Sequence, residues 1–218
     1  MSVRKGRPWG GPATGPPDAS VEGSDAALAA AAARDPGLRV AFVPARASDL
    51  ARALGLAGQP RGAHEVPVDG LRLNAAPHLA LNAVVLGAPP DRLRPWSRDP
   101  SIEVVVDGRE RFRGRATTVL VANGQYLRGA DIVPRGHPGD GRAEVQVYAL
   151  ARGERRAMRL RLAQGAHVPH PRIRELSGRR IEVRVAGRGL ALEVDGVARG
   201  RHRTLTVEVV PEALRIVL

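Results

Sequence analysis

Two acidic turns and a glycine-rich loop hold the residue types in this chain that can do chemistry. Between Val119 and Val145 an apolar run ends in Asn123-Gly124, and a loop rich in glycine leads to Asp140-Gly141. Glycine permits backbone angles that a Cβ forbids, and it leaves N–H and C=O groups accessible to a ligand. The second acidic turn is Asp195-Gly196-Val197. Taken alone, this Asp-Gly pair is typical of a hairpin turn.

Three histidines, His137, His167 and His170, offer nitrogen ligands for a metal ion. They share no helix and no carboxylate, so they are a weak signal for a metal site. Pro169 and Pro171 restrict the backbone around the last two. We therefore favour a packing or loop role for these histidines.

The order of residues in VANGQYLRGADIVPRGHPGDGRAEV resembles the C-terminal domain of the bacterial diacylglycerol kinase-like lipid kinases, which are relatives of sphingosine kinase. An Asn-Gly, a glycine cluster, a Pro and an Asp-Gly recur there in this order, and the resemblance continues through GAHVPHPRI and LEVDGVARG. It implies a β-sandwich in which Asn123 and Gly124 belong to a lipid-side loop. It also implies a structural Mg²⁺ held by Asp140 and by the backbone carbonyls of His137 and Arg142, a set of oxygen ligands that suits this ion.

The same family carries two nucleotide signatures, a Gly-Gly-Asp-Gly-Thr loop and a Pro-x-Gly-Thr-x-Asn-Asp-x-Ala-Arg segment. VEGSDAAL echoes the first through Gly23 and Asp25, and PARASDLARALGL is similar to the second and keeps Asp49. The Gly-Thr pair of the second signature is replaced by Arg46 and Ala47. Because a phosphate cradle needs bare backbone N–H groups, the sequence argues against ATP binding in the family's manner.

Catalysis in the family depends on a carboxylate that follows the Asp-Gly of LEVDGVARG and acts as general base on the lipid hydroxyl. This chain has Val197 at that position. Asp195 is therefore the remaining candidate for a catalytic residue, and phosphoryl transfer needs such a group near the attacking oxygen. If Asp195 is not turned inward, the pair is better interpreted as a hairpin turn.

The net charge of +12 raises the question of a polyanionic partner. Lys5 is the only lysine among 34 basic residues, and the arginines alternate with apolar residues as they do on solvated strand faces. This pattern argues against nucleic acid and leaves open a lipid or acidic membrane surface, a protein partner or a homo-oligomer. The absence of cysteine excludes disulfides and cysteine catalysis.

The distribution of apolar residues along the chain predicts where in the cell the protein is located. The chain has no apolar run of transmembrane length, and MSVRKGRPWGG lacks the apolar core of a signal peptide. We expect a cytoplasmic protein whose membrane contact, if it has any, is peripheral.

The elements that position these residues fall into three segments. Residues 1–20 are rich in Gly and Pro and predict a flexible arm. Residues 21–63 predict a short α/β remnant with a helix over Asp25–Arg34, a strand over Leu38–Val43 and a helix in SDLARALGL. Residues 64–218 predict an antiparallel β-sandwich with hairpin turns at Asp69-Gly70 and at Asp107-Gly108, and with one helix over Glu154–Gln164. The fold class is α+β, mainly β.

Three functions are compatible with these patterns. The first is a diacylglycerol kinase-like protein that is catalytically weak or inactive and acts through lipid or partner binding. The second is an active ATP-dependent lipid kinase completed by a partner subunit. The third is a basic module that binds nucleic acid or an acidic membrane surface. The sequence leaves open whether the protein is an enzyme.

Overall fold

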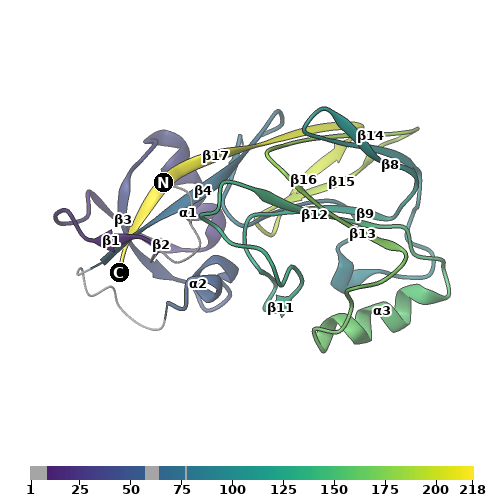
Figure 1. Ribbon diagram of the computed structural model, residues 1–218, viewed down its shortest axis with the longest axis horizontal. Coiled ribbons are helices and arrows are strands. Elements are labelled where there is room, and N and C mark those ends of the chain that lie inside the picture. The colour runs from purple at the N-terminus through teal and green to yellow at the C-terminus, as the bar shows by residue number, and fades with distance from the viewer. Residues whose placement is uncertain (1–8, 57–63, 77) are drawn as a thin grey trace.

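The computed structural model describes residues 9–56, 64–76 and 78–218 (Figure 1). The helices are α1 (Asp25–Arg34), α2 (Asp49–Ala53), the short 3₁₀ helix η1 (Pro90–Arg92) and α3 (Glu154–Ala163). The strands are β1 (Gly11–Pro12), β2 (Ala19–Gly23), β3 (Arg39–Pro44), β4 (His64–Leu73), β5 (Leu79–Ala80), β6 (Ala83–Gly87), β7 (Ser101–Val106), β8 (Arg109–Arg115), β9 (Thr118–Ala122), β10 (Tyr126–Leu127), β11 (Ala130–Asp131), β12 (Ala143–Tyr148), β13 (Ile173–Gly178), β14 (Arg180–Val185), β15 (Leu190–Val194), β16 (Val197–His202) and β17 (Thr204–Val217).

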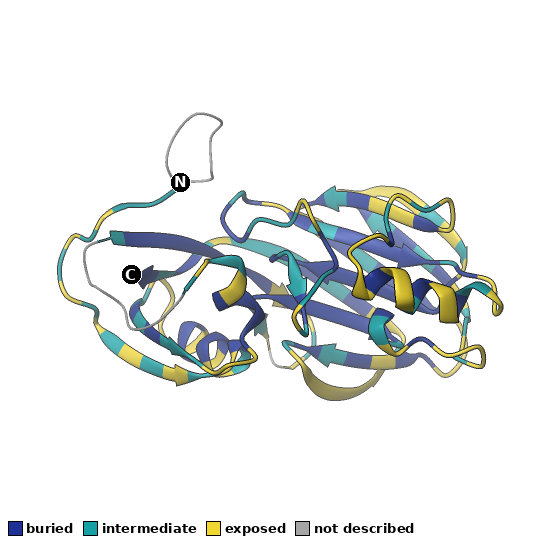
Figure 2. Ribbon diagram, turned by 90° about the horizontal axis from the view of Figure 1, so that it is seen from below, coloured by how far each residue is buried: buried dark blue, intermediate teal, exposed yellow. Residues whose placement is uncertain are grey.

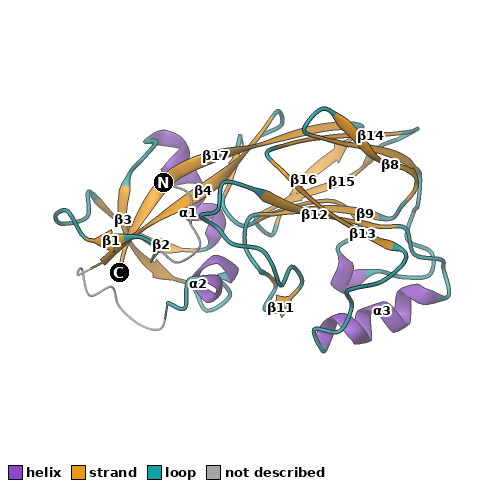
Figure 3. Ribbon diagram, viewed as in Figure 1, coloured by secondary structure: helices purple, strands orange, loops and turns teal. Residues whose placement is uncertain are grey.

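Two sheets make up most of the molecule (Figure 3). The larger sheet follows the order β1-β4-β17-β14-β7-β8, with β2, β3 and β5 attached to it, and the smaller sheet has the order β13-β12-β9-β6-β15-β16. Among the described residues every strand pairing is antiparallel except β2 with β3 and β3 with β17. The predicted fold class, mainly β with an antiparallel sandwich, is confirmed.

Alternating residues of the two sheets form the core of the sandwich. In β7, Ile102, Val104 and Val106 point inward and are buried, whereas the residues between them are more exposed. They pack with Val183 of β14 and Val145 of the opposite sheet. Figure 2 shows the inner strands as buried and the outer edges and α3 as largely exposed.

The α/β unit shares its sheet with the sandwich. Strand β17 pairs with β14 in its first half and with β3 in its last three residues, Arg215 to Val217. Its register against β4 shifts between Val210 and Leu214, where Glu212 has a φ of 50°. This bulge bends β17, so that the strand runs from the core of the sandwich into the α/β unit. Strands β17 and β4 therefore join the two parts of the molecule.

Helix α1 forms where the sequence predicts it, because an alanine run of high helix propensity follows a good N-cap. The side chain of Ser24 accepts the N–H of Ala27, and Arg34 lies in the last turn, where it complements the helix dipole. Leu28 faces inward and packs with Phe42 of β3 and Leu50 of α2. These contacts make a second, smaller core next to the sandwich.

The two Asp-Gly pairs predicted as hairpin turns differ in the structure. Asp107-Gly108 is the predicted hairpin turn, between β7 and β8. Asp69-Gly70 is not a turn and lies inside the continuous strand β4, so that prediction is wrong. The physical reason is close packing: a Cβ on Gly70 would lie 2.9 Å from the Cβ of Ala213, and the buried Asp69 carboxylate accepts the N–H groups of Gly141 and Glu212.

Of the predicted flexible arm, residues 1–8 lie outside the described residues, which begin at Trp9. Gly11 and Pro12 pair with β4, the indole of Trp9 donates to the Pro67 carbonyl at 3.1 Å, and residues 19 and 20 already belong to β2. Residues 57–63 of the predicted α/β remnant also lie outside the described residues. None of the described helices is long and apolar enough to cross a membrane.

Candidate functional site

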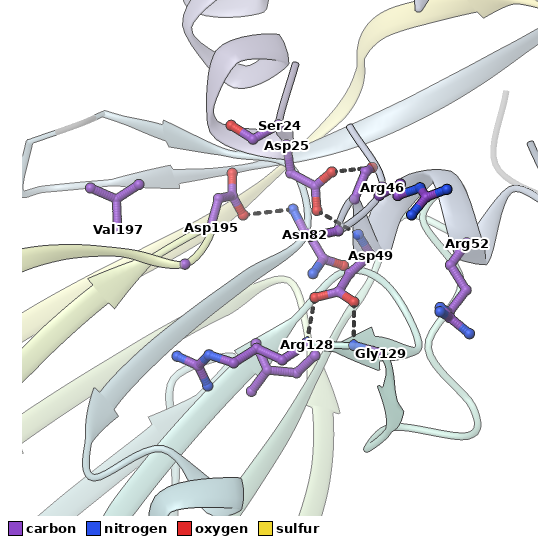
Figure 4. A pocket seen from close by; sticks show the side chains of 14 residues that line it. Ser24, Asp25, Arg46, Asp49, Arg52, Asn82, Arg128, Gly129, Asp195 and Val197 are labelled. Atoms are coloured by element: carbon purple, nitrogen blue, oxygen red, sulfur yellow. Dashed lines mark hydrogen bonds between the residues drawn. The ribbon is translucent and has the colours of Figure 1, made fainter. Parts of the chain in front are cut away.

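A cavity of about 590 Å³ lies where the α/β unit meets the sandwich (Figure 4). Its lining comes from five places: the start of α1, the start of α2 with the loop before it, the segment between β5 and β6, the β10–β11 turn and the β15–β16 turn. The lining residues include Ser24, Asp25, Arg46, Ser48, Asp49, Arg52, Asn82, Arg128, Gly129, Asp195 and Val197. Three of the predicted site residues, Asp25, Asp49 and Asp195, are thus brought to one cavity from positions far apart in the chain.

Asp25 is the first residue of α1, and its carboxylate caps the other helix, α2. It accepts the hydroxyl of Ser48 at 2.5 Å and the backbone N–H groups of Asp49 and Leu50 at 3.1 and 3.2 Å. Burial raises the pKa of Asp25, and the hydrogen bond from Ser48 opposes that shift. The N-terminus of α2, which could otherwise bind a phosphate, is therefore occupied by a carboxylate of the chain itself. Gly23, which precedes α1, does not line the cavity.

Asp49 ties α2 to the β10–β11 turn. Its two oxygens accept the backbone N–H groups of Arg128 and Gly129 at 2.5 and 2.7 Å. Both residues of this turn have a positive φ, 51° and 77°. The carboxylate thus fixes a turn that the local sequence alone would hold weakly.

Asp195 ties the β15–β16 turn to the segment between β5 and β6. Its carboxylate accepts the backbone N–H groups of Leu81, Asn82 and Ala83, each at 2.9 Å. Burial raises its pKa to about 6, against the lowering effect of these three bonds. Val197 lies two residues on, lines the same cavity and is 39% exposed.

Three arginines contribute positive charge to the cavity. Arg128 forms ion pairs with Asp91 at 2.8 Å and with Glu193. Arg52 stacks over the ring of Tyr126 at 5.6 Å, and neither Arg52 nor Arg46 forms an ion pair within the described part of the chain. Two guanidinium groups without an acidic partner therefore remain available at the wall of the cavity.

The sequence-based search missed Asn82, which organises the floor of the cavity. Its backbone N–H donates to Asp195, its carbonyl accepts from Asn123, and its side-chain amide donates to the Tyr126 carbonyl at 3.0 Å. Its Oδ1 is buried and has no hydrogen-bond donor among the described residues. A polar residue inside the apolar run LALNAVVLG was the signal that could have found it.

Asn123 and Gly124, predicted as a lipid-side loop, are buried. The amide of Asn123 donates to the carbonyls of Asp69 and Leu81 at 2.7 and 2.8 Å. A Cβ on Gly124 would lie 2.5 Å from Oδ1 of Asn82, so a larger residue does not fit there. The pair connects β9 to β4 and to the floor of the cavity, and its role toward a lipid stays a prediction.

The predicted magnesium ligands lie in a turn before β12. Asp140 accepts the N–H of Arg142 at 2.9 Å, and the carbonyl of His137 accepts those of Gly139 and Asp140 at 2.8 and 3.4 Å. Burial raises the pKa of Asp140. One half-buried carboxylate and a carbonyl that already accepts two bonds do not by themselves make the coordination shell that Mg²⁺ prefers. The ion stays a prediction.

Each of the three histidines contacts a different part of the chain. The buried His167 pairs with the Ile132 carbonyl at 2.8 Å, His170 accepts the N–H of Arg172 at 3.1 Å, and His137 lies edge-on to Trp9. Across the described residues no group of three or more His, Cys, Asp or Glu side chains could hold a metal ion. Each histidine has a packing or loop contact, as the sequence analysis favours.

Comparison with known proteins gives a family and a fold. The family model of the "YegS C-terminal NAD kinase beta sandwich-like domain" matches residues 91–218. A diacylglycerol kinase from Bacillus anthracis str. Sterne is 19% identical with a TM-score of 0.70, over 92% of this chain and 76% of that one. An NAD kinase from Archaeoglobus fulgidus in complex with ATP is 14% identical with a TM-score of 0.53, over 92% and 78%. At such identities these structures establish the fold alone. No curated protein matches significantly.

Proposed function

Because this chain belongs to the family of the YegS C-terminal, NAD kinase β-sandwich-like domain, we propose that it is a diacylglycerol kinase-like protein that acts through lipid or partner binding. It transfers phosphate from ATP to a lipid weakly or not at all. Its sandwich has a kinase-like fold, and the cavity lies beside that sandwich. The carboxylates in that cavity are engaged in holding the structure together.

The observation that carries the proposal is the environment of Asp195. A general base must reach the proton that it abstracts and must have an oxygen free to take it. Both oxygens of Asp195 accept backbone N–H groups, from Leu81 on one side and from Asn82 and Ala83 on the other. Its raised pKa of about 6 would suit a base, but its hydrogen bonds suit a structural tie. The nearby Val197 has no group that titrates.

The phosphate-binding side of the cavity supports the same conclusion. The first turn of α2 is capped by Asp25 and by Ser48, whose hydroxyl accepts the N–H of Ala51 at 3.0 Å. Asp25 also places a carboxylate at the start of α2, which would repel a phosphate at that end of the cavity. Phosphoryl transfer depends on positioning and on charge stabilisation, so the loss of this cradle removes a large part of the catalysis.

Binding of an anion remains compatible with the same cavity. Arg46 and Arg52 stand at its wall without acidic partners among the described residues. Guanidinium groups bind phosphate oxygens well, and here they would do so without a glycine loop. The protein can thus recognise a phosphorylated ligand while lacking the groups that activate a nucleophile.

A phosphate-transfer assay on a lipid panel tests the proposal. Labelled ATP is incubated with diacylglycerol micelles and the full chain, and the expected product is at background. Val197→Glu supplies the missing carboxylate, with Val197→Gln as the matched uncharged control. A general base contributes about 10²–10⁴-fold where the rest of the site is intact. We expect neither variant to reach robust turnover, because the phosphate cradle is also altered.

Two results would change the conclusion. Robust turnover by the parent protein that is lost in a folded Asp195→Asn variant would identify Asp195 as the base. Turnover that requires cell extract would identify an active kinase completed by a partner. The folded state of each variant is checked by circular dichroism, because Asp195 also has a structural role.

A further inference from the structure

Two large apolar side chains, Trp96 and Leu160, project into solvent from one region of the molecule. Trp96 is 72% exposed and Leu160 is 65% exposed, and among the described residues Val197 in the cavity is the only other large apolar side chain that is exposed. Trp96 lies in the loop between η1 and β7, and Leu160 lies on α3, which contacts η1. The region is away from the core of the sandwich, on the side seen in Figure 2.

The loop that carries Trp96 is held firmly in place. Arg94 and Ser97 close it from both ends, since the N–H of Arg94 donates to the Ser97 hydroxyl and the N–H of Ser97 donates to the Arg94 carbonyl, each at 2.9 Å. The fully buried Arg155 of α3 donates to the carbonyls of Pro95 and Ser97 at 2.8 and 2.7 Å. Trp96 is therefore displayed by a fixed turn that is bonded to α3.

The surface around these side chains is strongly basic. Residues 151–174 contain seven arginines, of which only Arg155 is fully buried, and one acidic residue, Glu154, which is 3.3 Å from Arg172. Within the described residues Arg152 and Arg156 form no ion pair. Arg156 and Leu160 are one helical turn apart and lie on the same exposed face, while Met158 and Leu162 are buried on the opposite one.

We infer that the exposed face of α3 and the Trp96 turn, here called the α3 surface, bind an anionic lipid bilayer. Arginines near such a surface are attracted to its negative potential, and a tryptophan ring is favoured at the level of the headgroups. Arg94 lies over the Trp96 ring at 5.6 Å, so one cation and one aromatic ring would enter the interface together. A nucleic acid would use the arginines but would gain little from the exposed Leu160.

The α3 surface is connected to the cavity by the β10–β11 hairpin. Strand β10 contacts α2, and β11 contacts α3. Figure 1 shows α2, β11 and α3 along the same lower side of the molecule. Docking through α3 would thus place the hairpin that lines the cavity close to the bilayer. The inference goes beyond the proposed function, since it concerns a separate surface and holds whether or not phosphate is transferred.

Vesicle sedimentation tests the α3 surface with the full-length chain. Vesicles of phosphatidylcholine alone are compared with vesicles that contain phosphatidylglycerol, at low and at physiological salt. The parent protein should bind the anionic vesicles, and more tightly at low than at physiological salt. Arg152→Gln with Arg156→Gln should weaken partitioning roughly 25-fold, since each arginine near an anionic surface contributes about fivefold. The matched control is Arg109→Gln with Arg111→Gln on the exposed edge strand β8, which should stay within about twofold of the parent.

The contribution of Trp96 is tested separately, by quenching of tryptophan fluorescence with lipids that carry brominated acyl chains. The parent should lose fluorescence on anionic vesicles, and Trp96→Ser should not, because Trp9 is packed against Gly139 away from this surface. Three results would overturn the inference: no binding to anionic vesicles, equal loss in the β8 control, or duplex DNA binding that is reduced by the α3 variants while vesicle binding is unchanged.

Discussion

Two Asp-Gly turns of this protein have the same sequence and the same backbone geometry, but they lie in different surroundings. Asp107-Gly108 closes the β7–β8 hairpin with φ values of 50° and 75°, and Asp195-Gly196 closes the β15–β16 hairpin with 46° and 80°. Asp107 is exposed and its carboxylate accepts the N–H groups of Arg179 and Arg180. Asp195 accepts three N–H groups from a segment more than 100 residues away, at the floor of the cavity.

The difference is electrostatic. The backbone N–H of Arg180 lowers the pKa of the exposed Asp107, whereas burial raises the pKa of Asp195 to about 6. The same dipeptide is thus a plain turn at one end of the sandwich and a joint between distant segments at the other. Position in the fold, and not the motif, decides which of the two roles an Asp-Gly turn has.

The largest difference should appear on removal of the two carboxylates. Asp195→Ala leaves three backbone N–H groups without their acceptor at the floor of the cavity, and we expect a loss of about 4 kcal/mol in the free energy of unfolding. Asp107→Ala leaves two exposed N–H groups that water can satisfy, so the expected loss is about 1 kcal/mol. Urea denaturation of the two variants measures both values. Equal losses would show that Asp195 is not a structural joint.

The sequence predicts the elements that depend on neighbouring residues better than the positions that depend on contacts distant in sequence. Local signals were sufficient for α1, since an alanine run after Ser24 predicts its bounds, and for the turn at Asp107. They failed at Asp69-Gly70, because the glycine there permits close approach of Ala213 and the aspartate is bonded to segments distant in sequence. A dipeptide does not reveal such long-range contacts.

The candidate site was predicted in part. Resemblance to a known family singled out Asp25, Asp49 and Asp195, and the three line one cavity. Apart from the Ser48 hydroxyl on Asp25, the donors that engage them are backbone N–H groups, which every residue has, so little in the side-chain pattern marks them. Asn82 was missed for a related reason: it lies in an apolar strand-like run and acts through its backbone as much as through its amide.

A smaller difference is expected in the dependence of stability on pH. Because the pKa of Asp195 is raised from 3.8 to about 6 in the folded protein, its stabilising contribution is fully present below about pH 4 and is lost as the pH rises through about 6. Relative to Asp195→Asn, the parent should gain about 2 kcal/mol between about pH 7 and pH 4.5. Urea denaturation over this range measures the gain.

Asp107→Asn is the matched control, and its sign is opposite. The pKa of Asp107 is lowered on folding, so its contribution is present above the unfolded pKa and is lost as the pH falls through the folded one. The parent should therefore lose stability relative to Asp107→Asn only below about pH 4. A parallel pH dependence for both pairs would contradict the assignment of the raised pKa to Asp195.

The smallest effect should come from the two glycines, and it should be the same at both turns. Gly108 and Gly196 have φ values of 75° and 80°, and a Cβ at either position would meet no atom within 4 Å. Alanine therefore destabilises the protein only through its left-handed backbone conformation, by about 1 kcal/mol in the free energy of unfolding for each variant. Similar values in urea denaturation would show that the turns themselves are equivalent and that the Asp side chains alone distinguish them. A much larger loss for Gly196→Ala would instead place the difference in the backbone of the β15–β16 turn, because Asp195 could then keep its three bonds only in one strained conformation.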